Sequence, residues 1–192
     1  MSDPTTPPPI EFRKHTLANG LDVIAQRRPG LPTVAVNLWY HVGSKNEERN
    51  QRGFAHLFEH IMFEGSEHYP GDFFKHLQPL GASINGSTST DRTNYFSDLP
   101  AVHVERVLAM ESDRMGWLIP ALDQKKLDVQ RDVVKNEYRQ THANRPYGQA
   151  WRILFEALYP PQHPYSWMTI GVMEDLDSAS RDDVAAFFRR FY

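Results

Sequence analysis

The chain has 192 residues, 40% of them hydrophobic and 23% charged, a balance typical of a globular domain with a sizeable core. The net charge of -3 comes from mixed signs without a Lys/Arg block, which argues against nucleic acid as a partner. The chain contains no cysteine, which excludes disulfides and thiolate chemistry, so any metal site must be built from His and carboxylate ligands.

The N-terminal segment, MSDPTTPPPIEF, begins with residues 1–9, four of which are proline, and these predict an extended, disordered leader. It lacks the basic stretch and apolar run of a secretory signal, and no apolar run approaches membrane-spanning length. We therefore expect a cytoplasmic chain without a membrane partner. A periplasmic or secreted location also suits a chain without cysteine.

Strand signals come next. Residues 12–28 predict two short strands joined at the Asn19-Gly20 turn. Residues 33–42 alternate apolar and polar side chains, which predicts a third strand. Its even-numbered face is expected to be core: Val34, Val36, Leu38 and Tyr40.

Residues 53–63 change to the helical period and have few polar positions, so they predict a largely buried helix. A short helix is expected at 71–81, followed by a strand pair at 82–90 and 93–99 around Asp91-Arg92. Further helices are expected at about 101–117, 122–141, 149–158 and 181–191. This order favours an α+β fold in which helices cover one face of an antiparallel sheet.

The segment HLFEH in the buried helix carries the main chemical signal. His56 and His60 lie four residues apart, so both rings can bind one cation, while Glu59 lies beside them and can reach a metal-bound water. This is the HExxH arrangement with the chain direction reversed. Zinc lowers the pKa of its bound water to about 7, and a neighbouring carboxylate can take the proton and pass it to a leaving amine. A purely polar stripe is the alternative, but burying these groups would be costly unless something satisfied them.

A catalytic zinc needs a third protein ligand. Glu137 follows the apolar residues Val133 and Val134 in the predicted helix RDVVKNEYRQ and could project toward the core. Spacing alone does not select it over the other candidates, which are Glu105, Glu111 and Asp132.

HLFEH, followed after 76 residues by Glu137 in QRDVVKNE, resembles the pitrilysin (M16) metallopeptidases. Further similar segments are LANGLDVIAQ, YHVGSKNE, GFAHLFEHIMFEGS, GASINGSTSTDRTNYF and HPYSWMTIGVMEDL. The resemblance implies a zinc metalloendopeptidase of the inverzincin type with a LuxS/mitochondrial-processing-peptidase-like metallohydrolase fold. It also implies one Zn²⁺ on His56, His60 and Glu137, with Glu59 as the general base.

The same resemblance implies that a peptide substrate adds as an extra strand to a sheet edge, where Asn85 and Gly86 meet its backbone. From the residues alone, this pair could equally mark a turn or a bulge. Gln130 stands where many family members have a glutamate, two helical turns before Glu137 on the same face. It is a candidate for hydrogen bonds to a ligand or to the substrate near the metal.

Family peptidases resemble a pair of homologous halves that close over a chamber, and nothing in this sequence matches the second half. We therefore expect residues 10–192 to be one catalytic domain that stops before its closing strand. It would need a second M16-like half, in cis or as another subunit, and would have little or no peptidase activity alone.

Two alternatives remain. The chain could be a metal-binding subunit without turnover of its own. It could also be a non-peptidase zinc site like that of S-ribosylhomocysteine lyase, but that enzyme relies on cysteine and this chain has none.

Overall fold

The computed structural model describes residues 10–192, so the leader expected at residues 1–9 lies outside the described part. Contacts divide the chain into two compact units, one up to Pro32 and one from Thr33 to Tyr192. The first unit contains the predicted hairpin, in which β1 (Arg13–Thr16) pairs antiparallel with β2 (Asp22–Ala25). Gly20 in its turn has a φ of 90°, a conformation that suits glycine.

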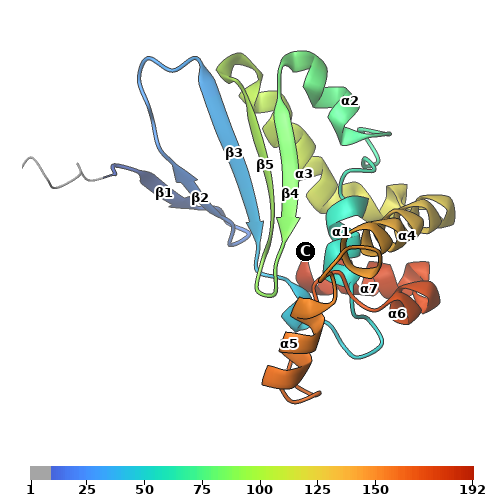
Figure 1. Cartoon of the computed structure of the whole chain (residues 1–192). Helices are drawn as coiled ribbons and strands as arrows, with labels where there is room; N and C mark the ends of the chain where they lie inside the picture. The colour runs from blue at the N-terminus through green and yellow to red at the C-terminus, as the bar shows by residue number, and fades with distance from the viewer. Residues whose placement is uncertain (1–9) are drawn as a thin grey trace, which may run out of the picture. The chain divides into compact units, whose positions relative to one another are not determined.

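The second unit contains an antiparallel sheet of three strands: β3 (Thr33–Tyr40), β4 (Ser83–Thr88) and β5 (Thr93–Pro100). The strand order is β3-β5-β4, which leaves β4 at an edge (Figure 1). The even-numbered residues of β3 are buried or half-buried and the odd-numbered ones are exposed, so the predicted core face is confirmed.

Helices cover one face of this sheet, as the sequence predicted (Figure 1). The helices α1 (Phe54–Ile61) and α2 (Phe73–Leu77) contact β4, and α3 (Val104–Ala121) contacts β3 and β5. Trp39 on the opposite face of β3 is 59% exposed. The remaining α-helices are α4 (Gln124–Tyr138), α5 (Ala150–Leu158), α6 (Met173–Ser178) and α7 (Arg181–Phe191). Short 3₁₀ turns lie at Ser44–Asn46, Gln78–Leu80 and Ala101–His103, and a π-helical turn at Arg139–Ala143.

Helix α1 is the centre of the larger core cluster, and its five apolar residues are all buried. Phe58 stacks on Phe187 of α7 with ring centroids 5.6 Å apart. The Tyr95 hydroxyl donates to the Phe58 carbonyl oxygen at 3.3 Å and so ties α1 to the sheet. The predicted burial of this helix is therefore confirmed, and its few polar side chains must find partners within the fold.

Two helical features differ from the expectation. Helix α3 continues past Trp117 to Ala121, with a kink at Trp117 (φ −128°) and Pro120 inside the helix. The sequence does not predict helix α6, because its six residues, MEDLDS, have no apolar period. A distant segment stabilises this helix, since Asp175 accepts hydrogen bonds from Arg52. Among residues 10–192, no helix has both the length and the apolar character required to cross a bilayer.

Candidate metal centre

Three side chains from two helices converge at the surface of α1. His56 and His60 lie on successive turns of α1, and Glu137 lies in the last turn of α4, which contacts α1. The Glu137 Oε2 atom is 3.7 Å from the His56 Nε2 atom and 3.4 Å from the His60 Nε2 atom. Of the candidates that sequence spacing left open, the structure brings only Glu137 to the two histidines.

These separations fit a shared cation. The three ligand atoms all lie within 4.8 Å of one another. Ligands about 2.0–2.2 Å from a tetrahedral zinc lie about 3.4 Å apart, close to both measured separations. The set of two imidazoles and one carboxylate is also the ligand set of several catalytic zinc sites. The residues present therefore fit zinc.

The ionisation states suit a cation as well. Burial, together with the neighbouring His60, lowers the pKa of His56 to about 4, so His56 is neutral near pH 7. A hydrogen bond from His60 lowers the pKa of Glu137, which is therefore ionised. Neutral imidazole and carboxylate are the forms that bind metal, so no proton need leave His56 or Glu137.

One detail departs from common metal sites. The second ring nitrogen of a ligating histidine usually donates to a carbonyl or a carboxylate. The His56 Nδ1 atom is buried and has no hydrogen-bond partner among the described residues. Packing and the backbone of α1 therefore hold this ring, without a hydrogen bond to a neighbour.

Glu59 lies between α1 and the edge strand β4. A Cβ atom placed on Gly86 would lie 3.1 Å from the Glu59 Cγ atom, so the missing side chain at Gly86 leaves room for Glu59. Burial raises the pKa of Glu59, whereas a hydrogen bond from the Thr88 side chain and the positive potential of His60 oppose that rise. Sequence patterns alone did not identify Thr88, which lies among other polar residues of the strand. Its position two residues after Gly86, on the same face of β4, is the signal that could have identified it.

A hollow of about 280 Å³ opens at this point, and Glu59, His60, Asn85 and Gln130 all line it. Asn85 is exposed on β4, and its Oδ1 atom accepts a hydrogen bond from the Gly86 N–H at 2.8 Å. Gln130 is buried, and its amide donates to Glu64 in the same hollow. The described hydrogen bond of Gln130 therefore goes to Glu64, which is not one of the three candidate ligands.

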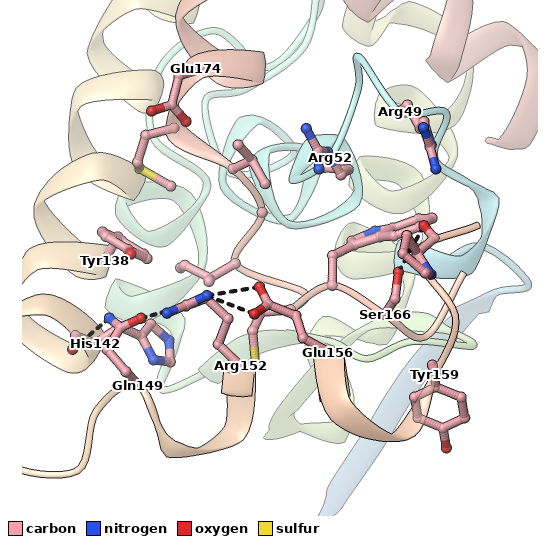
Figure 2. Close-up of a pocket in the computed structure, with 17 residues that line it drawn as sticks. Arg49, Arg52, Tyr138, His142, Gln149, Arg152, Glu156, Tyr159, Ser166 and Glu174 are labelled. Atoms are coloured by element: carbon pink, nitrogen blue, oxygen red, sulfur yellow. Dashed lines mark hydrogen bonds and ion pairs between the residues drawn. The ribbon is translucent and has the colours of Figure 1, made fainter. Parts of the chain in front are cut away.

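A larger cavity of about 780 Å³ lies between α5, the end of α4 and residues 159–174 (Figure 2). Its lining includes Tyr138, the residue after Glu137. Figure 2 shows His142 beside Gln149, whose side-chain amide donates a hydrogen bond to the His142 carbonyl oxygen. Arg152 in this cavity pairs with Glu156 at 2.8 Å. Neither the candidate base nor any of the three candidate ligands lines it, whereas Glu59 and His60 line the smaller hollow.

Comparisons with known proteins identify the family. The model of the family described as insulinase (peptidase family M16) matches residues 22–159. The zinc protease PqqE of Helicobacter pylori is 32% identical over 181 residues, which are 92% of this chain and 40% of that protein.

Solved structures agree too. A protease from Helicobacter pylori has a TM-score of 0.86 and 31% identity, covering 93% of this chain and 42% of that one. The first half of the periplasmic protease PqqL from Escherichia coli has a TM-score of 0.82 and 25% identity, covering 94% of this chain and 40% of that one. This chain spans less than half the length of these relatives.

The family match covers well over half of the chain, and the structural similarity extends over nearly all of it. The resemblance to pitrilysin-type peptidases and the mixed helix and sheet fold are both confirmed. The chain belongs to the insulinase family of peptidases, M16.

Proposed function

We propose that this chain is the zinc-binding catalytic part of an M16 endopeptidase. Membership of a peptidase family supports peptide hydrolysis. The observation that carries the finer proposal is the convergence of His56, His60 and Glu137 within 4.8 Å, with Glu59 one residue before His60 in the adjoining hollow.

Each residue has a distinct role. His56, His60 and Glu137 hold one Zn²⁺ ion. The ion, when bound, polarises the scissile carbonyl and makes water acidic enough to attack near neutral pH. Glu59 takes the proton of the attacking water and delivers it to the leaving amine nitrogen. Burial raises the pKa of Glu59 toward the working pH, which favours both taking and returning the proton.

The substrate lies extended along β4. No other described strand pairs with the outer edge of β4, so it can accept a peptide as an additional strand. The Gly86 N–H bonds to the Asn85 side chain, an exposed partner that a peptide carbonyl can replace. Asn85 and Gly86 are therefore the proposed backbone-binding residues. Gln130 would act indirectly by holding Glu64 in the hollow.

A second M16-like half completes the enzyme. This chain spans 40% of the PqqE relative and 40% of a structure that is itself the first half of a protease. Residues 10–192 then form one catalytic domain whose partner half follows in cis or comes from another subunit. A metal-binding subunit without turnover of its own is the alternative that the partial coverage also supports.

Metal analysis and a cleavage assay test the proposal. We expect one zinc per chain after purification without chelator, little cleavage of a fluorogenic peptide by the chain alone, and cleavage once a second M16-like half is added. A wild-type chain that binds no zinc would contradict the proposed site. Strong cleavage by the chain alone would contradict the need for a second half and leave the zinc chemistry standing.

A further inference from the structure

Helix α1 starts in an unusual way. Its N-cap residue, Gly53, has a φ of 104°, in the left-handed region, and carries no side chain that could accept a hydrogen bond from the first turn. Close packing also disfavours a side chain here, because a Cβ atom on Gly53 would lie 3.0 Å from the Cα atom of the facing Gly171. The free N–H groups of the first turn therefore need an acceptor from elsewhere.

Glu47 supplies that acceptor. Its Oε2 atom accepts from the Gly53 N–H at 3.0 Å, and its Oε1 atom accepts from the Ala55 N–H at 2.9 Å. The Trp167 ring N–H donates to the Oε2 atom at 3.0 Å. Glu47 is only 6% exposed, and burial raises its pKa to about 8, while these three donors act in the opposite direction.

Two further contacts hold the same end of α1. The Arg52 backbone N–H and side chain both donate to Asp175 of α6, and the Val172 N–H donates to the Arg52 carbonyl oxygen at 3.2 Å. These contacts end at Arg52, before the helix begins. Inside the first turn, the Phe54 N–H donates to the Gln51 carbonyl oxygen at 3.1 Å. Among the described residues, Glu47 is the one side chain that accepts from a backbone N–H of this turn, that of Ala55.

His56 is the residue after Ala55 and the third residue of α1, which has only eight residues. In so short a helix, a first turn without an acceptor frays, and fraying would move the His56 ring directly. The His56 Nδ1 atom has no hydrogen-bond partner among the described residues that could hold the ring instead. The position of His56 therefore depends on the backbone of the first turn.

We infer that Glu47 is a positioning residue for the metal centre: its carboxylate fixes the first turn of α1 and thereby places the His56 ring for the cation. This inference rests on the proposed zinc site. It adds a residue that acts through the helix backbone and touches neither the metal nor the substrate.

The test uses Glu47→Gln in the full chain. Glutamine keeps the shape and one acceptor oxygen, but it turns an NH₂ group toward one of the three N–H donors. Loss of an outer partner of a metal ligand weakens metal binding by roughly 10- to 100-fold, and we expect a rise of this size in the zinc Kd. The visible spectrum of bound Co²⁺ should also change, because it reports the geometry around His56. Glu48→Gln is the matched control, since Glu48 is exposed and its ion pair in the described part of the chain is with Arg190 on the surface.

A second variant covers the case in which Glu47→Gln fails to fold. Trp167→Phe keeps an aromatic ring and removes one of the three donors, so the zinc Kd should rise by about threefold in the same direction. The inference is overturned if folded Glu47→Gln binds zinc as tightly as Glu48→Gln and shows an unchanged Co²⁺ spectrum. If Glu47→Gln does not fold, the same result with Trp167→Phe overturns it. A wild-type chain without zinc overturns the metal site itself, so the two failures are distinguishable.

Discussion

The Glu59 side chain crosses directly over Gly86 of the edge strand, where a Cβ atom would lie 3.1 Å from the Glu59 Cγ atom. Thr88 lies two residues further along the same face of β4, and hydrogen bonding by its side chain opposes the rise that burial causes in the pKa of Glu59. On its other side, the Thr88 hydroxyl lies 3.5 Å from the Thr93 hydroxyl, which donates to the Val42 carbonyl oxygen at 2.9 Å. The strand proposed to bind the peptide thus also holds the proposed base.

Thr88→Val should therefore impair proton transfer. Valine has nearly the same shape but no hydroxyl, and the loss of a hydrogen bond to a carboxylate should lower kcat about tenfold with little change in KM. The measurement is steady-state peptide cleavage with a second half present. Thr88→Ser keeps the hydroxyl and should restore most of the rate; equal rates in the valine and serine variants would contradict the assigned role.

Arg114 predicts a large effect on stability. It is 1% exposed, pairs with the buried Glu111 at 2.6 Å and lies over the ring of Tyr95. Arg114→Met leaves the Glu111 charge unpaired and should lower the free energy of unfolding by about 3–5 kcal/mol. Urea unfolding at pH 7 measures this loss. The double variant with Glu111→Met should lose less than the single variant, and an equal or greater loss would refute the explanation.

The metal-free chain should become less stable as the pH falls from about 6.5 to about 4. Burial holds the pKa of His56 at about 4, below its ordinary value of about 6.5, so the unfolded chain binds the additional proton in this range. The linked loss is up to about 3 kcal/mol. Urea unfolding in the presence of a chelator would show it, and His56→Gln should flatten the curve. His15→Gln is the control variant, because His15 is exposed. If the unfolding free energy of His56→Gln depends on pH as steeply as that of the wild type, His56 is not the source of the effect.

Removing the third ligand should cost most of the metal affinity. Glu137→Gln keeps the size of the side chain but removes the charge that faces both histidines, and we expect the zinc Kd to rise by about 100-fold or more. Glu105→Gln is a useful control, because sequence spacing alone did not separate Glu105 from Glu137. Isothermal titration of zinc into both variants decides, and similar affinities would exclude Glu137 as a ligand.

Much of the fold could be predicted because its signals are local. The two-residue period of β3 and the helical period of α1 each depend on a single stretch of sequence. Helix α6 could not be predicted in this way, since its Asp175 is held by Arg52 from a distant segment. The extension of α3 through Pro120 also depends on its surroundings and not on propensity, which disfavours proline inside a helix.

The residues of the candidate site likewise differ in whether a local sequence pattern identifies them. His56, Glu59 and His60 form a local pattern on one helix, whereas Glu137 needed the family resemblance, because only folding brings α4 beside α1. Glu47 gave no signal of its own, since its importance comes from an N-cap glycine six residues later and a tryptophan 120 residues away.

The most direct test of the central claim is peptide cleavage by Glu59→Gln in a zinc-loaded preparation that contains a second half. Glutamine cannot take a proton from water, so the variant should bind one zinc as the wild type does and lose at least about 100-fold in kcat. The exposed Glu67→Gln should leave both zinc content and rate unchanged. Full turnover by a zinc-loaded Glu59→Gln variant would contradict the proposed mechanism.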